Sequence, residues 1–204
     1  MTKDRLLAFS DGVFAILITI LVLEFTVPKF QTGHLLIAML QQWPILVAYI
    51  VSYFYVGTLW LFHHDYFQAL KSIDRRLNLI NLLMLFSITL INYPMALVAE
   101  TLNRGNNGDI RVAFIAYAVI ALFISGTFQL LYFYVGKHAE LMSEKMKRAR
   151  FRKSHSDPLI SMVLYILAIV TSLFWVSLGA VFLLLGICFH FVAYLHLSNA
   201  LGQK

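Results

Sequence analysis

The sequence has few charged residues and only one cysteine. Of its 204 residues, 13% are charged and 60% are hydrophobic, and the mean hydropathy is +0.78. A soluble domain typically has about 25% charged residues, so there is too little charge here to cover a surface that faces water everywhere. The lone Cys188 excludes an internal disulfide and a metal site built from several thiolates. We therefore expect lipid to be the solvent for much of the chain.

Signatures of catalysis are also missing. The sequence contains no His-Glu-x-x-His, no Gly-x-Ser-x-Gly and no paired-aspartate motif. It also has no long polar stretch that would fold into a separate soluble domain. These absences argue against an intramembrane enzyme.

Six apolar segments are long enough to cross a bilayer, whose core of about 30 Å needs about 20 helical residues. We predict an all-α membrane protein with one six-helix domain over residues 1–204. Pro44 and Pro94 lie inside two of the segments, where kinks are expected. The last two segments are separated only by a predicted turn at Ser177 and Gly179. The expected spans are approximately 6–25, 35–62, 77–99, 110–135, 159–176 and 178–196.

The distribution of lysine and arginine predicts the orientation. Thirteen of these residues fall on one side of the predicted spans and three on the other, which places both termini in the cytoplasm. The polar loop 136–157 lies on the cytoplasmic side and contains a basic run from Lys145 to Lys153. Topology and anionic lipid explain such a run beside a membrane better than nucleic acid does. Three tryptophans fall near span ends, where interfacial indoles are common: Trp43, Trp60 and Trp175.

The first span has two different faces when its residues are placed at 100° per step with Ile16 at zero. Asp11 lies at about 220° and Ser10 at about 120°, away from an apolar stripe centred on Ile16. The stripe is compatible with a pore lining or with ordinary packing against another helix. The Thr19 hydroxyl at the edge of the stripe is likewise compatible with a local role, a hydrogen bond to the Ala15 carbonyl one turn back. The stripe contains Phe9, Gly12, Val13, Ile16, Thr19, Ile20 and Leu23.

Asp11 is an acidic residue inside a membrane helix, which marks a function or a paired structural network. Partners are expected at the same depth, near the cytoplasmic ends of the second and third spans. A structural clamp and a histidine-based proton relay or pH sensor both fit these residues. A metal site at His63-His64-Asp65 is disfavoured, because adjacent helical side chains point about 100° apart. The predicted cluster contains Arg5, Ser10, Asp11, His63 or His64, and Asn78 or Asn81.

The opening residues Arg5-Leu-Leu-Ala-Phe9-Ser10-Asp11 match the pattern Arg-x-x-x-Phe-Ser-Asp. An apolar run with a threonine follows and ends in Val22-Leu23-Glu24, and a histidine pair closes the second span. In these features the chain resembles the prokaryotic transmembrane protein 175 family, cation channels related to the lysosomal potassium channel of animals. Six spans in about 200 residues resemble its one-repeat members, so the likeness extends over the whole chain.

The resemblance implies a moderately selective potassium channel in the membrane of a prokaryotic cell, which also passes larger alkali cations. It implies a homotetramer in which the first helix of each subunit lines one central pore, without a cofactor and without a carbonyl filter. By position after Asp11, it implies a constriction at Ile16, Ile20 and Leu23 and a selectivity layer at Thr19. It also implies that Arg5, Phe9, Ser10 and Asp11 hold the pore helix against its neighbours.

Two alternatives to a channel stay open at this point. One is a secondary transporter that couples flux to protons through Asp11 and the His63/His64 cluster. The other is a scaffold that conducts no ions.

Overall fold

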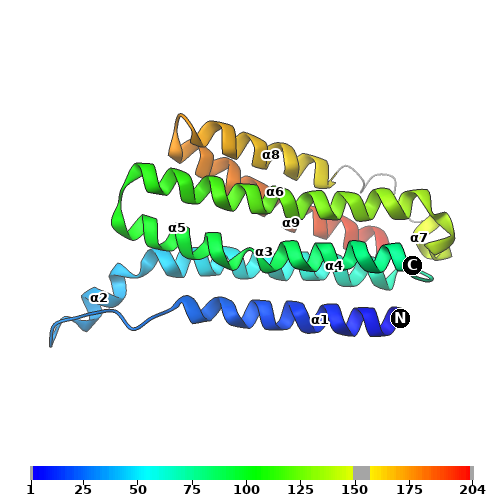
Figure 1. Cartoon of the computed structure of the whole chain (residues 1–204), viewed down its shortest axis with the longest axis horizontal. Helices are drawn as coiled ribbons and strands as arrows, with labels where there is room; N and C mark the ends of the chain where they lie inside the picture. The colour runs from blue at the N-terminus through cyan, green and yellow to red at the C-terminus, as the bar shows by residue number, and fades with distance from the viewer. Residues whose placement is uncertain (1, 149–156, 203–204) are drawn as a thin grey trace.

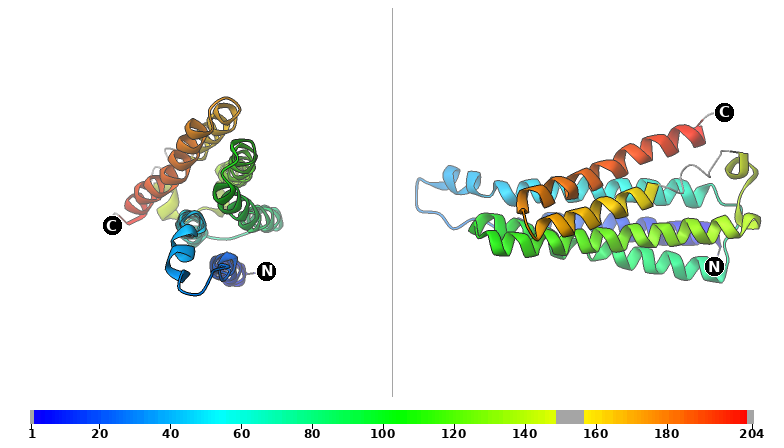
Figure 2. Two further views of the ribbon diagram at one scale, coloured as in Figure 1. Left: turned by 90° about the vertical axis from the view of Figure 1, so that its left-hand side faces the viewer. Right: turned by 90° about the horizontal axis from the view of Figure 1, so that it is seen from above.

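The computed structural model describes residues 2–148 and 157–202 and is built from helices (Figure 1). Within this part of the chain, the one β pairing is an isolated bridge between Leu70 and Met142. The longer helices run along the long axis of the molecule (Figures 1 and 2). Their bounds are α1 Lys3–Ile20, η1 Leu21–Glu24, α2 Leu35–Gln41, α3 Trp43–Gln68, α4 Arg75–Thr89, α5 Asn92–Arg104, α6 Asn107–Lys137, η2 Ala139–Leu141, α7 Glu144–Arg148, α8 Asp157–Ser172 and α9 Val176–Gly202.

The bundle has two distinct ends. The start of α1, the end of α3, the start of α4 and the end of α6 lie together at the right of Figure 1. We call this the basic end, because it holds the described residues of the loop 136–157 and most of the lysines and arginines. The basic run predicted in that loop continues through residues 149–153, which lie outside the described residues. At the opposite end lie α2 and the turns between α5 and α6 and between α8 and α9 (Figure 1).

Within residues 2–148 and 157–202, five helical stretches are long and apolar enough to cross a membrane: Lys3–Glu24, Trp43–Gln68, Arg75–Arg104, Asn107–Lys137 and Val176–Leu195. A sixth apolar helix, Pro158–Ser172, is shorter. The prediction of an all-α membrane protein is therefore confirmed. Five of the six expected spans correspond to full-length apolar stretches, and the fifth in chain order corresponds to the shorter helix α8.

Proline explains two interruptions in the helices. The expected span 35–62 is wrong as a single helix, because the chain breaks at Gln42 into α2 and α3, with Pro44 in the first turn of α3. Proline has no backbone N–H and disfavours helical geometry in the residue before it. Pro94 follows the break between α4 and α5 at Leu90 and Ile91, so the third span is interrupted where a kink was expected.

The last turn of the chain lies earlier than predicted. It is formed by residues 173–175, and Ser177 and Gly179 already belong to α9. A Cβ on Gly179 would lie 1.8 Å from Ser172 Oγ, and one on Gly186 would lie 2.5 Å from a carbon of the Tyr165 ring. Glycine at these positions therefore works as a contact surface that lets α9 approach α8 closely, and not as a turn residue.

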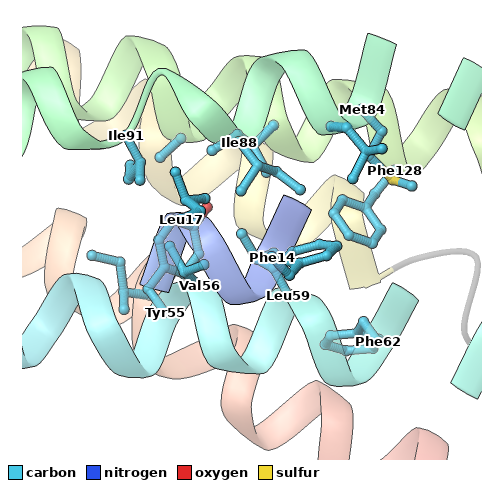
Figure 3. Close-up of a cluster of buried hydrophobic side chains, with 14 of the residues drawn as sticks. Phe14, Leu17, Tyr55, Val56, Leu59, Phe62, Met84, Ile88, Ile91 and Phe128 are labelled. Atoms are coloured by element: carbon cyan, nitrogen blue, oxygen red, sulfur yellow. The ribbon is translucent and has the colours of Figure 1, made fainter. Parts of the chain in front are cut away.

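The part of the core shown in Figure 3 lies between α1, α3, α4 and α6, and the core continues to α5, α8 and α9. Phe14 and Leu17 project from α1 toward Val56 and Leu59 of α3 and toward Met84 and Ile88 of α4. In the view along the bundle, α1 lies at its edge, beside α3 and with one side open (Figure 2, left). The pore-helix candidate is thus attached to the subunit through one face only.

Candidate pore helix and its anchoring site

The two faces of α1 differ in burial as the angular prediction requires. Its buried side chains are Leu6, Leu7, Ser10, Phe14 and Leu17. At 100° per residue these lie between about 80° and 180° from Ile16. The face around Ile16 is largely exposed along the length of the helix, and only Val13 and Ile20 on it are partly buried against the core. An exposed apolar face on a helix at the edge of a bundle requires lipid or another protein surface against it.

The residues predicted to form the constriction lie on or beside this exposed face. Ile16 is 64% exposed and Leu23 72% exposed. Ile20 is half-buried at the edge of the face. Thr19 is exposed, and its hydroxyl donates to the carbonyls of Ile16 (2.8 Å) and Ala15 (3.0 Å). The bond to Ala15 is thus present, and it leaves the oxygen lone pairs of Thr19 free to accept from water.

Ser10 and His63 are joined through one asparagine. Asn81 Nδ2 donates to Ser10 Oγ (3.0 Å), and Asn81 Oδ1 accepts from His63 Nε2 (2.7 Å). All three side chains are buried, and the His63 ring stacks on Phe67 with centroids 4.5 Å apart. Because Asn81 presents its oxygen to the ring, His63 carries its proton on Nε2. This chain connects α1, α3 and α4 in the interior.

Asp11 and His64 form a second, more exposed chain. Asp11 Oδ1 accepts from Trp60 Nε1 (2.9 Å) and from His64 Nδ1 (3.3 Å). His64 Nε2 lies 2.9 Å from Gln68 Nε2, which donates to it. The side chains of His64 and Asp11 are about one-third exposed, at 29% and 35%. Both histidines thus contact α1 or a residue bonded to it, but through different partners, Asn81 for His63 and Asp11 for His64.

Three of the predicted clamp residues form no part of these two chains of hydrogen bonds. Arg5 is exposed and makes no hydrogen bond or ion pair with any described residue. The Phe9 ring is 52% exposed on the same side as Ile16. Asn78 Oδ1 is buried without a hydrogen-bond partner among the described residues, so Asn81 is the asparagine that contacts Ser10.

Two partners of the site were missed from the sequence. Trp60 was interpreted as an interfacial indole, but it lies eight residues before the end of α3 and faces Asp11. Its spacing of four residues from His64 and eight from Gln68 puts all three on one face of α3. That spacing was the available signal. Within the part of the chain that the structure describes, no group of histidine, cysteine or carboxylate side chains could hold a metal ion.

The geometry of α1 and its partners can be compared with known proteins. The model of the family "Endosomal/lysosomal potassium channel TMEM175" matches residues 5–91, which include every predicted site residue. A potassium channel from Chamaesiphon minutus is 34% identical over 200 residues, which cover 96% of this chain and 95% of that protein. The chain belongs to the TMEM175 family. It is therefore an ion channel, and not an enzyme.

Two further comparisons agree with membership of the TMEM175 family. A potassium channel from Streptomyces collinus is 35% identical over 145 residues, which cover 71% of this chain and 69% of that protein. The crystal structure of a lysosomal potassium-selective channel TMEM175 homolog from Chamaesiphon minutus superposes with a TM-score of 0.79. It is 32% identical and covers 94% of this chain and 97% of its own. The fold described above is thus that of a TMEM175 channel over nearly the whole chain.

Proposed function

We propose that this TMEM175 family member is a potassium-selective channel in which four copies of the chain assemble around a pore lined by α1. The observation that carries the proposal is the exposed apolar face of α1, with Ile16 and Leu23 largely exposed while Phe14 and Leu17 are buried. A face that a single subunit leaves open along a whole membrane helix suits a shared axis. The relatives named as potassium channels support potassium as the ion.

In the proposed assembly, Ile16 forms the narrowest ring, and Ile20 and Leu23 lie one and two turns further from the basic end. Four isoleucine side chains around an axis make an apolar neck that closes by dewetting. An ion crosses such a neck with part of its water removed and no charged ligand in compensation. Potassium is more weakly hydrated than sodium and loses less, so selectivity is moderate and larger alkali cations also pass.

Thr19 supplies the polar layer of this pore. Its hydroxyl proton is engaged by the carbonyls of Ala15 and Ile16. The hydroxyl oxygen therefore faces the axis as an acceptor, which suits a cation or the hydrogen of its hydration water.

The two chains of hydrogen bonds between α1 and its neighbouring helices are proposed to act as the clamp that holds α1 in place. The carboxylate of Asp11 bonds to Trp60 and His64, so in the proposed assembly it does not face the axis. Its task is to fix the rotation of α1 about its own axis, because a rotated helix would remove Ile16 from the neck. The proton-coupled transporter alternative used Asp11 and the histidines as a relay, and the channel family disfavours it. By the distribution of basic residues, the basic end lies in the cytoplasm of a prokaryotic cell, with both termini.

The test is electrical. The purified protein is reconstituted in a planar bilayer with potassium on one side and an equal concentration of sodium on the other. We expect single-channel steps and a reversal potential displaced from zero in the direction of potassium selectivity. A reversal potential at zero would overturn potassium preference, and saturable flux without steps would favour the transporter. Mass photometry of the detergent-solubilised protein measures the number of subunits.

A further inference from the structure

The start of the pore helix is attached to the end of α3 by one lysine. Lys3 Nζ donates to the backbone carbonyls of Gln68 (3.2 Å) and Leu70 (3.0 Å). The last carbonyls of a helix have no partner within the helix, and a cation there is favoured by the helix dipole. Gln68 also contacts His64, which contacts Asp11. The position of α1 at the basic end therefore depends on the position of residues 68–70.

Residues 70–72 are in turn paired with the segment that follows α6. The backbone amide of Lys71 donates to the Leu141 carbonyl (2.8 Å), and Leu70 forms an antiparallel bridge with Met142. Leu141 and Met146 are buried and anchor this segment to the bundle. A second bond joins the same regions: the Tyr134 hydroxyl, near the end of α6, donates to Asp74, the residue that caps α4. The two loops at the basic end are therefore one connected structure.

The two segments that form this structure, residues 70–76 and 137–147, contain six lysines and arginines and three carboxylates, so their net charge is positive. Among the described side chains, five exposed cations lie in these segments, Lys71 on a loop and the others at the adjoining helices, and we call them the basic collar: Lys71, Arg75, Arg76, Lys137 and Lys147. Lys147 pairs with Glu144 on its own helix. No carboxylate among the described residues forms an ion pair with Lys71, Arg75 or Arg76. Because α4 begins at Arg75 and α6 ends at Lys137, the collar lies at the boundary between apolar helix and water.

We propose that the basic collar binds the anionic headgroups of phospholipids and that this binding is transmitted to the pore helix through residues 68–72 and Lys3. The proposal deepens the proposed channel function and rests on it. Anionic lipid is the partner that the place and the charge favour, because the cations lie where the apolar spans end and headgroups begin. A lipid bound across the collar fixes the loop 70–76, and with it the carbonyls that hold Lys3.

The first prediction of the proposal concerns binding. Each cation near an anionic surface contributes a factor of about five to lipid binding. The triple variant Lys71→Gln/Arg75→Gln/Arg76→Gln should therefore retain much less phosphatidylglycerol than the wild type in native mass spectrometry. These side chains are exposed, so the variant is expected to fold. Lys29→Gln, an exposed lysine at the opposite end, is the matched control and should retain as much as the wild type.

The second prediction concerns transmission. Potassium current in vesicles of phosphatidylcholine with phosphatidylglycerol should exceed that in pure phosphatidylcholine severalfold, and the triple variant should lose this difference. Lys3→Met should lose the difference as well while it still retains phosphatidylglycerol, because it breaks the link and not the binding surface. Inorganic phosphate added to phosphatidylcholine vesicles should not replace the lipid.

The outcomes separate the two levels of the argument. No potassium current from the wild type in any vesicle would overturn the proposed function. Potassium current that is equal in both lipids, or a triple variant that retains phosphatidylglycerol like the wild type, would overturn the basic collar as a lipid site. Current that phosphate restores would identify a free anion as the ligand, and would overturn lipid. A Lys3→Met channel that keeps its full lipid response would overturn the transmission.

Discussion

The indole nitrogen of Trp60 on α3 donates a hydrogen bond of 2.9 Å to the Asp11 carboxylate on α1. The same carboxylate oxygen also accepts from His64, one turn further along α3. Two donors from one helix therefore converge on one oxygen of the pore-helix candidate. These two hydrogen bonds fix the rotation of α1 as well as its distance from α3, because a carboxylate that rotated away would lose both partners at once.

Removing the indole donor should lower the stability of the subunit by a modest amount. Interhelical hydrogen bonds in membrane proteins contribute about 0.6 kcal/mol on average, so Trp60→Phe should lower the melting temperature slightly. Asp11→Ala should lower it more, because it leaves two donors without an acceptor. Combined in a double-mutant cycle, the two changes should be less than additive. Additive effects would mean that the bond between Trp60 and Asp11 contributes nothing measurable.

Ile16→Asn should increase the potassium current. An amide ring at the proposed neck holds water there and removes the dewetting barrier. Single-channel recording in planar bilayers measures the effect. Ile166→Asn is the matched control, because Ile166 is an exposed isoleucine on α8, outside the proposed pore. Should both variants conduct like the wild type after correct assembly, Ile16 would not be part of the gate.

Thr19→Val should reduce the preference for potassium over sodium while the channel still assembles. Valine has nearly the shape of threonine but lacks the hydroxyl that bonds the Ile16 and Ala15 carbonyls. Thr19→Ser keeps the hydroxyl and should stay closer to the wild type. Reversal potentials under potassium and sodium gradients compare the three channels. Equal reversal potentials for all three would remove the hydroxyl from the selectivity layer.

Much of the arrangement around α1 could be predicted from the sequence. Apolar length and the position of Asp11 predicted a two-faced helix, and Ser10, Asp11 and Asn81 do make contacts between helices. These contacts depend on local periodicity and on depth in the membrane, which the sequence encodes directly. The opposite burial of Phe14 and Ile16 follows from the same periodicity.

Other features depend on tertiary contacts that periodicity does not encode. Tryptophan near the end of a span is typical of a membrane interface, and the bond from Trp60 to Asp11 forms because α1 packs beside α3. Glycine is a common turn residue, yet Gly179 lies within α9, where the absence of a side chain leaves room for Ser172 of α8. Arg5 and Phe9 belong to the family pattern but face away from the subunit.

The contact between α8 and α9 should tolerate no added methyl group. Gly186→Ala would place a Cβ 2.5 Å from the Tyr165 ring, which is fully buried. Overpacking of this kind costs about 1–3 kcal/mol, so the melting temperature should fall by several degrees. Gly126→Ala on α6 is the control, since a Cβ there meets nothing within 4 Å, and alanine also favours helix. An equal fall in both variants would point to an effect of alanine itself and not to the contact.

Asp74 predicts how stability depends on pH at the basic end. Partial burial acts to raise the pKa of its carboxyl, but hydrogen bonds from the Tyr134 hydroxyl and the Leu77 amide outweigh it and hold the pKa below its ordinary value. A carboxyl with a lowered pKa in the folded state stabilises the protein above its unfolded pKa of about 3.9. That contribution is lost as the pH falls through the folded pKa.

Asp74→Asn keeps an N-cap acceptor but has no charge, so it should be less stable than the wild type at about pH 7 and should approach it at about pH 3. Tyr134→Phe removes the strongest of the favourable bonds and should reduce the same pH dependence. Melting temperatures measured across this pH range test both variants, and a constant difference between Asp74→Asn and the wild type would show that the charge of Asp74 does not stabilise the fold.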